Sequence, residues 1–228
     1  MDDNQMNLNE GFDETAVKQD GFVMRMVKAI VNPTDLFVQL KEKPDFWKLL
    51  LVMGIGTALA YIPNMGLFRD LIYEQFLAAP QKIQITDELI NAGVSGMIAV
   101  AVVMATLIPL IKGFLVHLLG MLFNSKGNIK NTISVLTYAT IPSFIGGILN
   151  LSIMGITKNP GIQLSLVRLL EPERAMTAPF VYKLAALVNP FTIWYYVLAV
   201  IGVSYVQEVS KPKALIIVLV PTLIMLLL

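Results

Sequence analysis

The sequence contains no cysteine and a single histidine, His117, among its 228 residues. The absence of cysteine excludes structural disulfides, thiolate metal sites and cysteine nucleophiles. One histidine leaves little room for a histidine-based metal site. The net charge of +1 gives no reason to expect nucleic acid as a partner. We therefore predict a chain without a cofactor, a metal ion or a catalytic residue.

Motifs for enzymatic or ion-coupled chemistry are also missing. The chain has no GxxxxGK[ST] phosphate loop, no HExxH zinc motif and no paired-carboxylate motif of a hydrolase. No acidic residue lies in the middle of an apolar run, where proton- or sodium-coupled carriers usually have one. These absences argue against an ATPase or a hydrolase.

Apolar residues are abundant instead, at 56% of the chain, and charged residues make up only 14%. Soluble domains carry about 25% charged residues, so the excess of apolar residues requires a bilayer. We predict an all-α fold: a polytopic membrane helical bundle of about five transmembrane helices, with amphipathic interfacial helices. The five expected spans cover about residues 46–65, 91–111, 132–156, 190–206 and 214–228.

The second apolar stretch is longer than a membrane requires. It runs from Leu89 to Phe123, about 35 positions, which as a helix would reach about 52 Å. The hydrocarbon core is only about 30 Å thick. We expect the span to end near Ile111, with the remainder bent or lying along the interface.

The chain divides into two parts. Residues 1–21 are acidic and poor in apolar residues, which predicts a disordered cytoplasmic tail. Residues 22–228 form the membrane domain, which begins with two short amphipathic helices, from Phe22 and from Pro33. These helices lie either on the lipid surface or against the protein's own loops.

Basic residues set the orientation. Lysine and arginine are more frequent in the N-terminal segment and near residues 126–130 and 211–213 than in the other connections. The positive-inside rule therefore favours a cytoplasmic N-terminus, in a multi-pass protein of the cell membrane.

Two groups of residues are candidates for contacts. Small residues that allow close helix packing are Gly93, Gly96, Gly146 and Gly147. The long connection from Thr157 to Val188 is amphipathic and either lies on the outer leaflet or docks a partner. Its candidates for partner docking are Arg168, Glu171 and Arg174.

The second apolar run also contains polar and basic side chains. Ser95 and His117 resemble the dyad of an intramembrane serine protease, but about 33 Å of helix separates them. We therefore predict no dyad. Lys112 and His117 are the basic residues of this run and are candidates for a functional intramembrane polar group. We expect Lys112, at the span end, to snorkel to the head groups and His117 to be packed.

Two distant stretches carry a family resemblance. Asn32, Pro33, Phe37 and Pro44 precede the first span, and Leu187 to Ala214, with the sequence LVNPFTIW near its start, joins the last two runs. Together with Gly127, Tyr138 and Pro142, these stretches resemble the Yip1 domain family. The DLYGP and GYG motifs of eukaryotic members are absent, which argues against a role with Rab GTPases.

The resemblance implies a membrane adaptor without an enzymatic site. Among bacterial members, the chain resembles the accessory subunit of a four-component Bacillus ABC exporter. Its expected partners are then an ATPase, a permease, a membrane-fusion subunit and membrane lipids, in an exporter that protects against a toxic peptide or compound. The alternatives are a small carrier or channel for an unknown solute and a membrane-shaping protein.

Overall fold

The apolar runs form helices because the hydrocarbon core offers backbone groups no partner for hydrogen bonding. The computed structural model describes residues 19–80, 84–171 and 174–227, and every regular element in these ranges is helical. The predicted all-α membrane helical bundle is confirmed. The predicted tail lies outside the described residues except for its last three positions.

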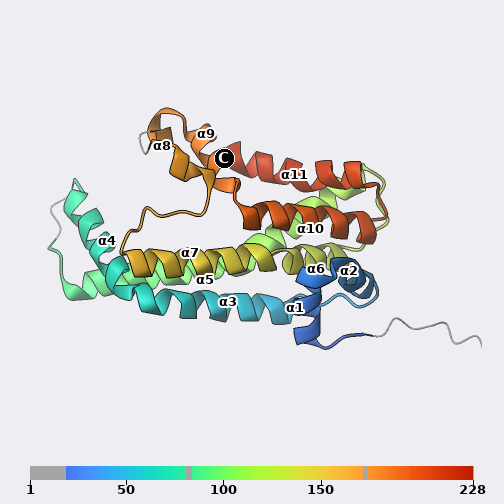
Figure 1. Cartoon of the computed structure of the whole chain (residues 1–228), viewed down its shortest axis with the longest axis horizontal. Helices are drawn as coiled ribbons and strands as arrows, with labels where there is room; N and C mark the ends of the chain where they lie inside the picture. Colours follow the sequence, from blue (N-terminus) through green and yellow to red (C-terminus); the bar gives the residue numbers. More distant parts are fainter. Residues whose placement is uncertain (1–18, 81–83, 172–173, 228) are drawn as a thin grey trace, which may run out of the picture.

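The bundle consists of long, roughly aligned helices (Figure 1). Its first half comprises α3 (Trp47–Tyr61), a 3-10 turn η1 (Ile62–Asn64), α4 (Met65–Ala78), α5 (Asp87–Leu122), α6 (Ile129–Ala139) and α7 (Ile141–Thr157). The second half comprises η2 (Leu166–Leu169), α8 (Arg174–Thr177), α9 (Pro179–Leu187), α10 (Pro190–Val206) and α11 (Lys211–Leu227). Two short helices, α1 (Phe22–Val31) and α2 (Pro33–Glu42), cover one end.

Fewer helices than predicted satisfy the length of a membrane crossing. Three stretches of the described chain are long and apolar enough, namely Trp47–Ala78, Asp87–Leu122 and Ile129–Thr157. A fourth exists if α9 and α10, which are bent by 73° relative to each other, form one span. By this measure the described residues contain three or four crossings, where about five were expected. The reason is that α10 and α11 have 17 residues each, or about 25 Å, which is about one turn short.

The long second apolar run forms one helix, α5, of 36 residues, with Pro109 inside it. The helix therefore continues past Ile111, where the span was expected to end. The Thr86 side chain caps its start by accepting a hydrogen bond from the Leu89 amide, and Asp87 and Glu88 favour the positive end of the helix dipole. Packing against α3, α6 and α11 supports the helix and offsets the unfavourable effect of the proline.

Helix α2 packs against the protein rather than on lipid. Asn32 caps it, with Pro33 in its first turn. The Phe37 side chain is 0% exposed and lies against α10 and α6. A Cβ atom at Gly202 of α10 would lie only 3.1 Å from Phe37 Cζ, so the ring enters a space that the glycine leaves open.

Helix α1 has apolar residues on two sides. Phe22, Met26 and Ile30 pack against the core, whereas Val23 and Val31 are 71% and 70% exposed. The helix lies across the end of the bundle (Figure 1). Its outer side therefore suits the lipid surface that the sequence predicted for it.

Polar contacts hold this end of the bundle together. The Asn131 amide of α6 donates hydrogen bonds to the carbonyls of Leu40 and Lys41 at the end of α2. Lys41 Nζ lies 2.8 Å from a carboxylate oxygen of Glu208, and this contact lowers the pKa of Glu208. The two stretches that carry the family resemblance, about 160 residues apart in the sequence, thus meet in space.

Truncating the Phe37 side chain tests this junction. We expect Phe37→Ala to lower the free energy of unfolding in mixed micelles by about 3–5 kcal/mol, because a fully buried ring is lost and a cavity remains. The exposed Val31→Ala change is the matched control, with an expected effect within about 0.5 kcal/mol. Equal effects of the two changes would show that the ring does not hold α2 in place.

The ion pair of Asp20 and Lys28 gives a prediction for pH. Hydrogen bonding from Lys28 lowers the pKa of Asp20 from 3.8, and bonding to Asp20 raises the pKa of Lys28 from 10.5. The carboxylate's contribution to stability is lost as pH falls through the lowered pKa, and the ammonium's as pH rises through the raised pKa. We expect hydrogen-exchange protection of α1, corrected for intrinsic rates, to be constant between about pH 5 and pH 9 and to fall outside this window. Asp20→Asn, the control, should remove the acidic limb of the profile, and an unchanged profile would contradict the assignment.

Candidate functional site

A cavity of about 660 Å³ lies between α3, α5, α7 and α10. It exists because α10 accompanies only part of α7. Phe191, at the start of α10, packs on Gly146, near the start of α7, so the rest of α7 extends beyond α10. Most of the lining is apolar, and includes Met53, Met104, Ile108, Phe144 and Leu151.

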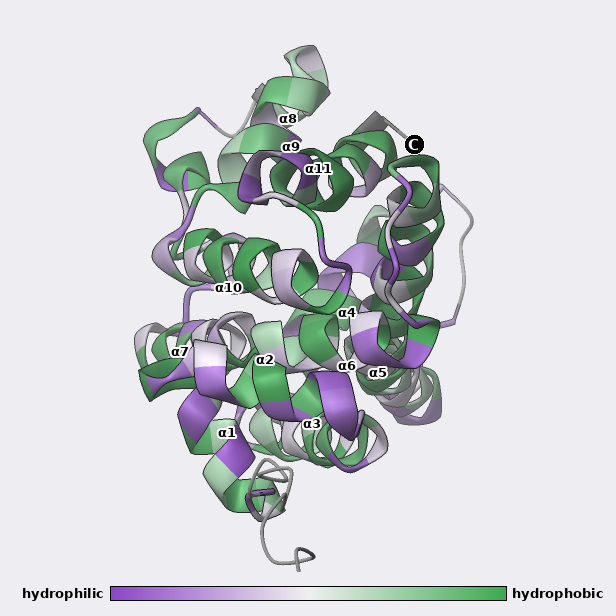
Figure 2. Cartoon of the chain, turned by 90° about the vertical axis from the view of Figure 1, so that its right-hand side faces the viewer, coloured by the Kyte–Doolittle hydropathy of each residue, from purple (hydrophilic) through white to green (hydrophobic). Residues whose placement is uncertain are grey.

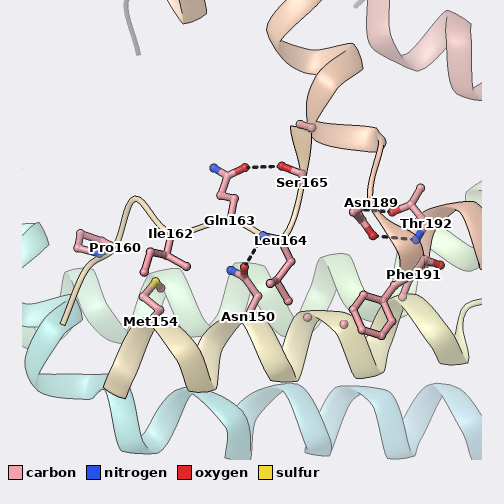
Figure 3. Close-up of a pocket in the computed structure, with 14 residues that line it drawn as sticks. Asn150, Met154, Pro160, Ile162, Gln163, Leu164, Ser165, Asn189, Phe191 and Thr192 are labelled. Carbon is pink, nitrogen blue, oxygen red and sulfur yellow. Dashed lines mark hydrogen bonds between the residues drawn. The ribbon is translucent and has the colours of Figure 1, made fainter. Parts of the chain in front are cut away.

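A second cavity, of about 360 Å³, adjoins the first (Figure 3). The two share the lining residues Ser143, Gly147, Asn150, Met154 and Thr192. Asn150 Oδ1 accepts a hydrogen bond of 3.1 Å from the Leu164 amide, which holds the connecting loop over α7. Asn189 Oδ1 accepts one of 2.8 Å from the Thr192 amide and thereby caps α10.

Lys112 lines the larger cavity, and its Nζ lies 4.8 Å from the centre of the Tyr195 ring. Tyr195 precedes Val206, the last residue of α10, by about 11 positions, or about 16 Å. The ammonium group therefore lies along the length of the bundle, away from its ends, and Lys112 is half-buried. Because α5 continues for about 15 Å beyond Lys112, this residue does not lie at a helix end. Its snorkelling to the head groups stays a prediction.

The charge of Lys112 has no carboxylate beside it in the described structure. No Asp or Glu is among the residues that line either cavity, and the ion pairs of the described residues do not include Lys112. The polar side chains around the larger cavity are uncharged, namely Thr57, Thr140, Ser143, Asn150 and Thr192. The Tyr195 ring face attracts the cation without neutralising it.

His117 lies apart from this cavity. Its Nδ1 atom is buried and has no hydrogen-bond partner among the described residues. Ser95 and His117 lie on the same unbroken helix, α5, about 33 Å apart, so the structure does not bring them together. The described residues contain no group of three or more His, Cys, Asp or Glu side chains that could hold a metal ion.

The four glycines singled out in the sequence occupy two kinds of environment. A Cβ atom at Gly93 would lie 2.8 Å from Ile72 of α4, and one at Gly146 would lie 2.5 Å from Phe191. At Gly96 and Gly147 a Cβ would meet no atom within 4 Å, so neither glycine permits a close approach in this structure. Gly147 instead lines both cavities.

Other glycines that allow close contacts were missed. A Cβ at Gly113 would lie 2.9 Å from the Cα of Ile133, and one at Gly120 would overlap Gln207. The seven-residue spacing of this pair, which places both on one side of a helix, was the available signal. Gly202, which faces Phe37, had no comparable signal.

The predicted docking residues lie towards the end of the bundle opposite to the end that carries α1 and α2 (Figure 1). Arg168 is exposed in η2, and Glu171 is exposed just after it. Arg174 begins α8, but its side chain lies outside the described part of the structure. Leu169 and Met176 nearby are 80% and 89% exposed.

Comparison with known proteins places this geometry in context. A model of the Yip1 domain matches residues 27–228. An uncharacterized protein of Methanocaldococcus jannaschii is 28% identical over 138 residues, which cover 58% of this chain and 89% of the archaeal protein. No solved structure matches the chain.

Neighbouring glycines of α7 offer a matched test of the α7–α10 contact. We expect Gly146→Ala to lower the free energy of unfolding by about 1–3 kcal/mol, because the new methyl group would overlap Phe191. Gly147→Ala should be neutral or stabilising by up to about 1 kcal/mol, because alanine favours a helix and space is open there. Chemical denaturation followed by circular dichroism measures both, and indistinguishable effects would contradict the contact.

Proposed function

The chain belongs to the Yip1 domain family, and we propose that it is a non-enzymatic integral membrane accessory protein that binds or helps assemble a membrane complex. The proposed complex is an ABC-type exporter that protects the cell against a toxic peptide or compound. Its permease, ATPase and membrane-fusion subunits would be the partners. The family match and the apolar helices support the membrane part of this proposal directly.

The observation that carries the adaptor role is the surface of residues 166–171 and 174–187, here called the outer segment. It includes η2, α8 and α9, and exposes apolar side chains at Leu166, Leu169, Met176, Phe180, Val181 and Leu184. Contiguous exposed apolar residues commonly mark interaction sites. Arg168 and Glu171 lie beside them, and this mixture of apolar centre and charged rim fits a protein interface.

Charge distribution supports a cytoplasmic N-terminus and a location in the cell membrane. Figure 2 views the end of the bundle that carries α1 and α2 and shows hydrophilic segments on these helices and at the start of α11. Lys41, Lys126 and Glu208 meet at this end. The outer segment lies towards the opposite end, on the side where an extracytoplasmic partner would approach (Figure 1).

A second function, a small carrier or channel, is favoured by the two adjoining cavities. Ligand sites form between the helices of bundles, and the larger cavity has the volume of such a site. Flux of solute into liposomes containing the purified chain alone would support this alternative against the adaptor.

The outer segment provides the test of the adaptor role. We expect a photo-crosslinker at Leu169 or Met176 in the full chain, in native membranes, to capture the permease or membrane-fusion subunit of an ABC exporter. The double change Leu169→Gln and Met176→Gln should lower co-purification of that complex about tenfold or more, because interfaces depend on a few central side chains.

Val31→Gln, an equally polar change at the opposite end, is the matched control and should leave co-purification unchanged. Crosslinks to lipid alone would show that the outer segment rests on the membrane surface. That result, or solute flux by the isolated chain, would overturn the proposal.

A further inference from the structure

We propose that the larger cavity binds an anionic amphiphile, a molecule whose phosphate or carboxylate head group reaches Lys112 and whose apolar part fills the remaining space. This assignment does not depend on the adaptor role. It rests on three features of the cavity: an unneutralised cation, an apolar lining and an opening towards lipid.

The cation is the first feature. Lys112 lies within the apolar helix α5, about 15 Å from its last residue, and an ionisable residue in a membrane helix usually faces a partner or a ligand. Its one cation contact in the described structure is the ring of Tyr195, at 4.8 Å. No carboxylate lines the cavity, so a positive charge remains for a ligand to neutralise. A charge-assisted hydrogen bond from Lys112 Nζ to an anionic oxygen of the ligand would neutralise this charge.

The lining is the second feature. A volume of about 660 Å³ lies within the range of about 300–1,000 Å³ for small-molecule sites. Apolar side chains from three helices, among them Met53, Ile108 and Leu151, bound most of it. A small inorganic anion would leave these surfaces uncovered, whereas an acyl chain would cover them. The apolar lining therefore selects an amphiphile.

The opening is the third feature. We infer the opening from Met104 of α5, which lines the cavity and is 50% exposed. Met104 lies within the apolar stretch Asp87–Leu122, which is long enough to cross a membrane, so its exposed side would face lipid. An amphiphile dissolved in the bilayer can therefore enter sideways, without crossing water.

The test uses the full chain, purified in detergent, and native mass spectrometry. The probes are dioleoylphosphatidylglycerol, oleate and, as a zwitterionic control, dioleoylphosphatidylcholine. We expect the two anionic probes to bind about tenfold more tightly than the zwitterionic lipid, and Lys112→Gln to abolish this preference. Lys112→Arg should retain it. Lys48→Gln, which removes an exposed lysine at the start of α3, is the matched control and should have no effect.

A second measurement covers the case in which Lys112→Gln does not fold. A photoactivatable oleate on the unaltered chain should label cavity residues such as Met53, Met104 and Phe144, and phosphatidylglycerol should reduce the labelling. Labelling confined to other surfaces would overturn the proposal, as would equal binding by Lys112→Gln. Displacement by inorganic phosphate would show a site for small anions and would overturn the assignment to an amphiphile. Because no partner is present, failure of the adaptor role leaves these results unaffected.

Discussion

The insertion of Phe37 between α6 and α10 fixes the arrangement on which the rest of this structure depends. The ring fills the space that Gly202 leaves open, so α2 closes one end of the bundle and positions α10 from that end. Helix α10 runs from this end of the bundle back to its first residue, Pro190. Phe191, in its first turn, packs on Gly146 of α7. Because α10 begins at this level, the rest of α7 continues without it, and both cavities lie along α7 from Ser143 to Met154, on either side of this contact.

The sequence was sufficient for the local features of the fold. The helix expected from Pro33 and the span expected from residue 190 both begin where the sequence placed them, and Asn32 and Asn189 cap these helices. The apolar excess predicted a membrane bundle because composition alone determines which solvent can accept the chain. The family resemblance rested on two stretches that prove to be in contact, although nothing in the one-dimensional pattern indicated that contact.

Features that depend on packing between distant elements could not be predicted. The excess length of the second apolar run left open whether the part after Ile111 bends or lies along the interface, and packing against neighbouring helices keeps it helical to Leu122. The position of Lys112 beside the Tyr195 ring depends on that packing. The contacts of Gly113, Gly120 and Gly202 likewise depend on which residue of another helix faces each glycine, and the sequence alone does not specify that residue. The count of crossings differs from the expected five because α10 and α11 have 17 described residues each, about one turn short of a hydrocarbon core.

Pro109 has one further effect, through the backbone of α5. A proline carries no amide hydrogen, so the carbonyl four positions earlier, at Ala105, lacks its usual donor. Both residues line the larger cavity. Kinks in helices arise where this ladder is interrupted, so α5 has its lowest bending stiffness beside the cavity wall. The shape of this cavity wall therefore depends on the packing of α5 against α3, α6 and α11 rather than on the hydrogen bonds of the helix alone.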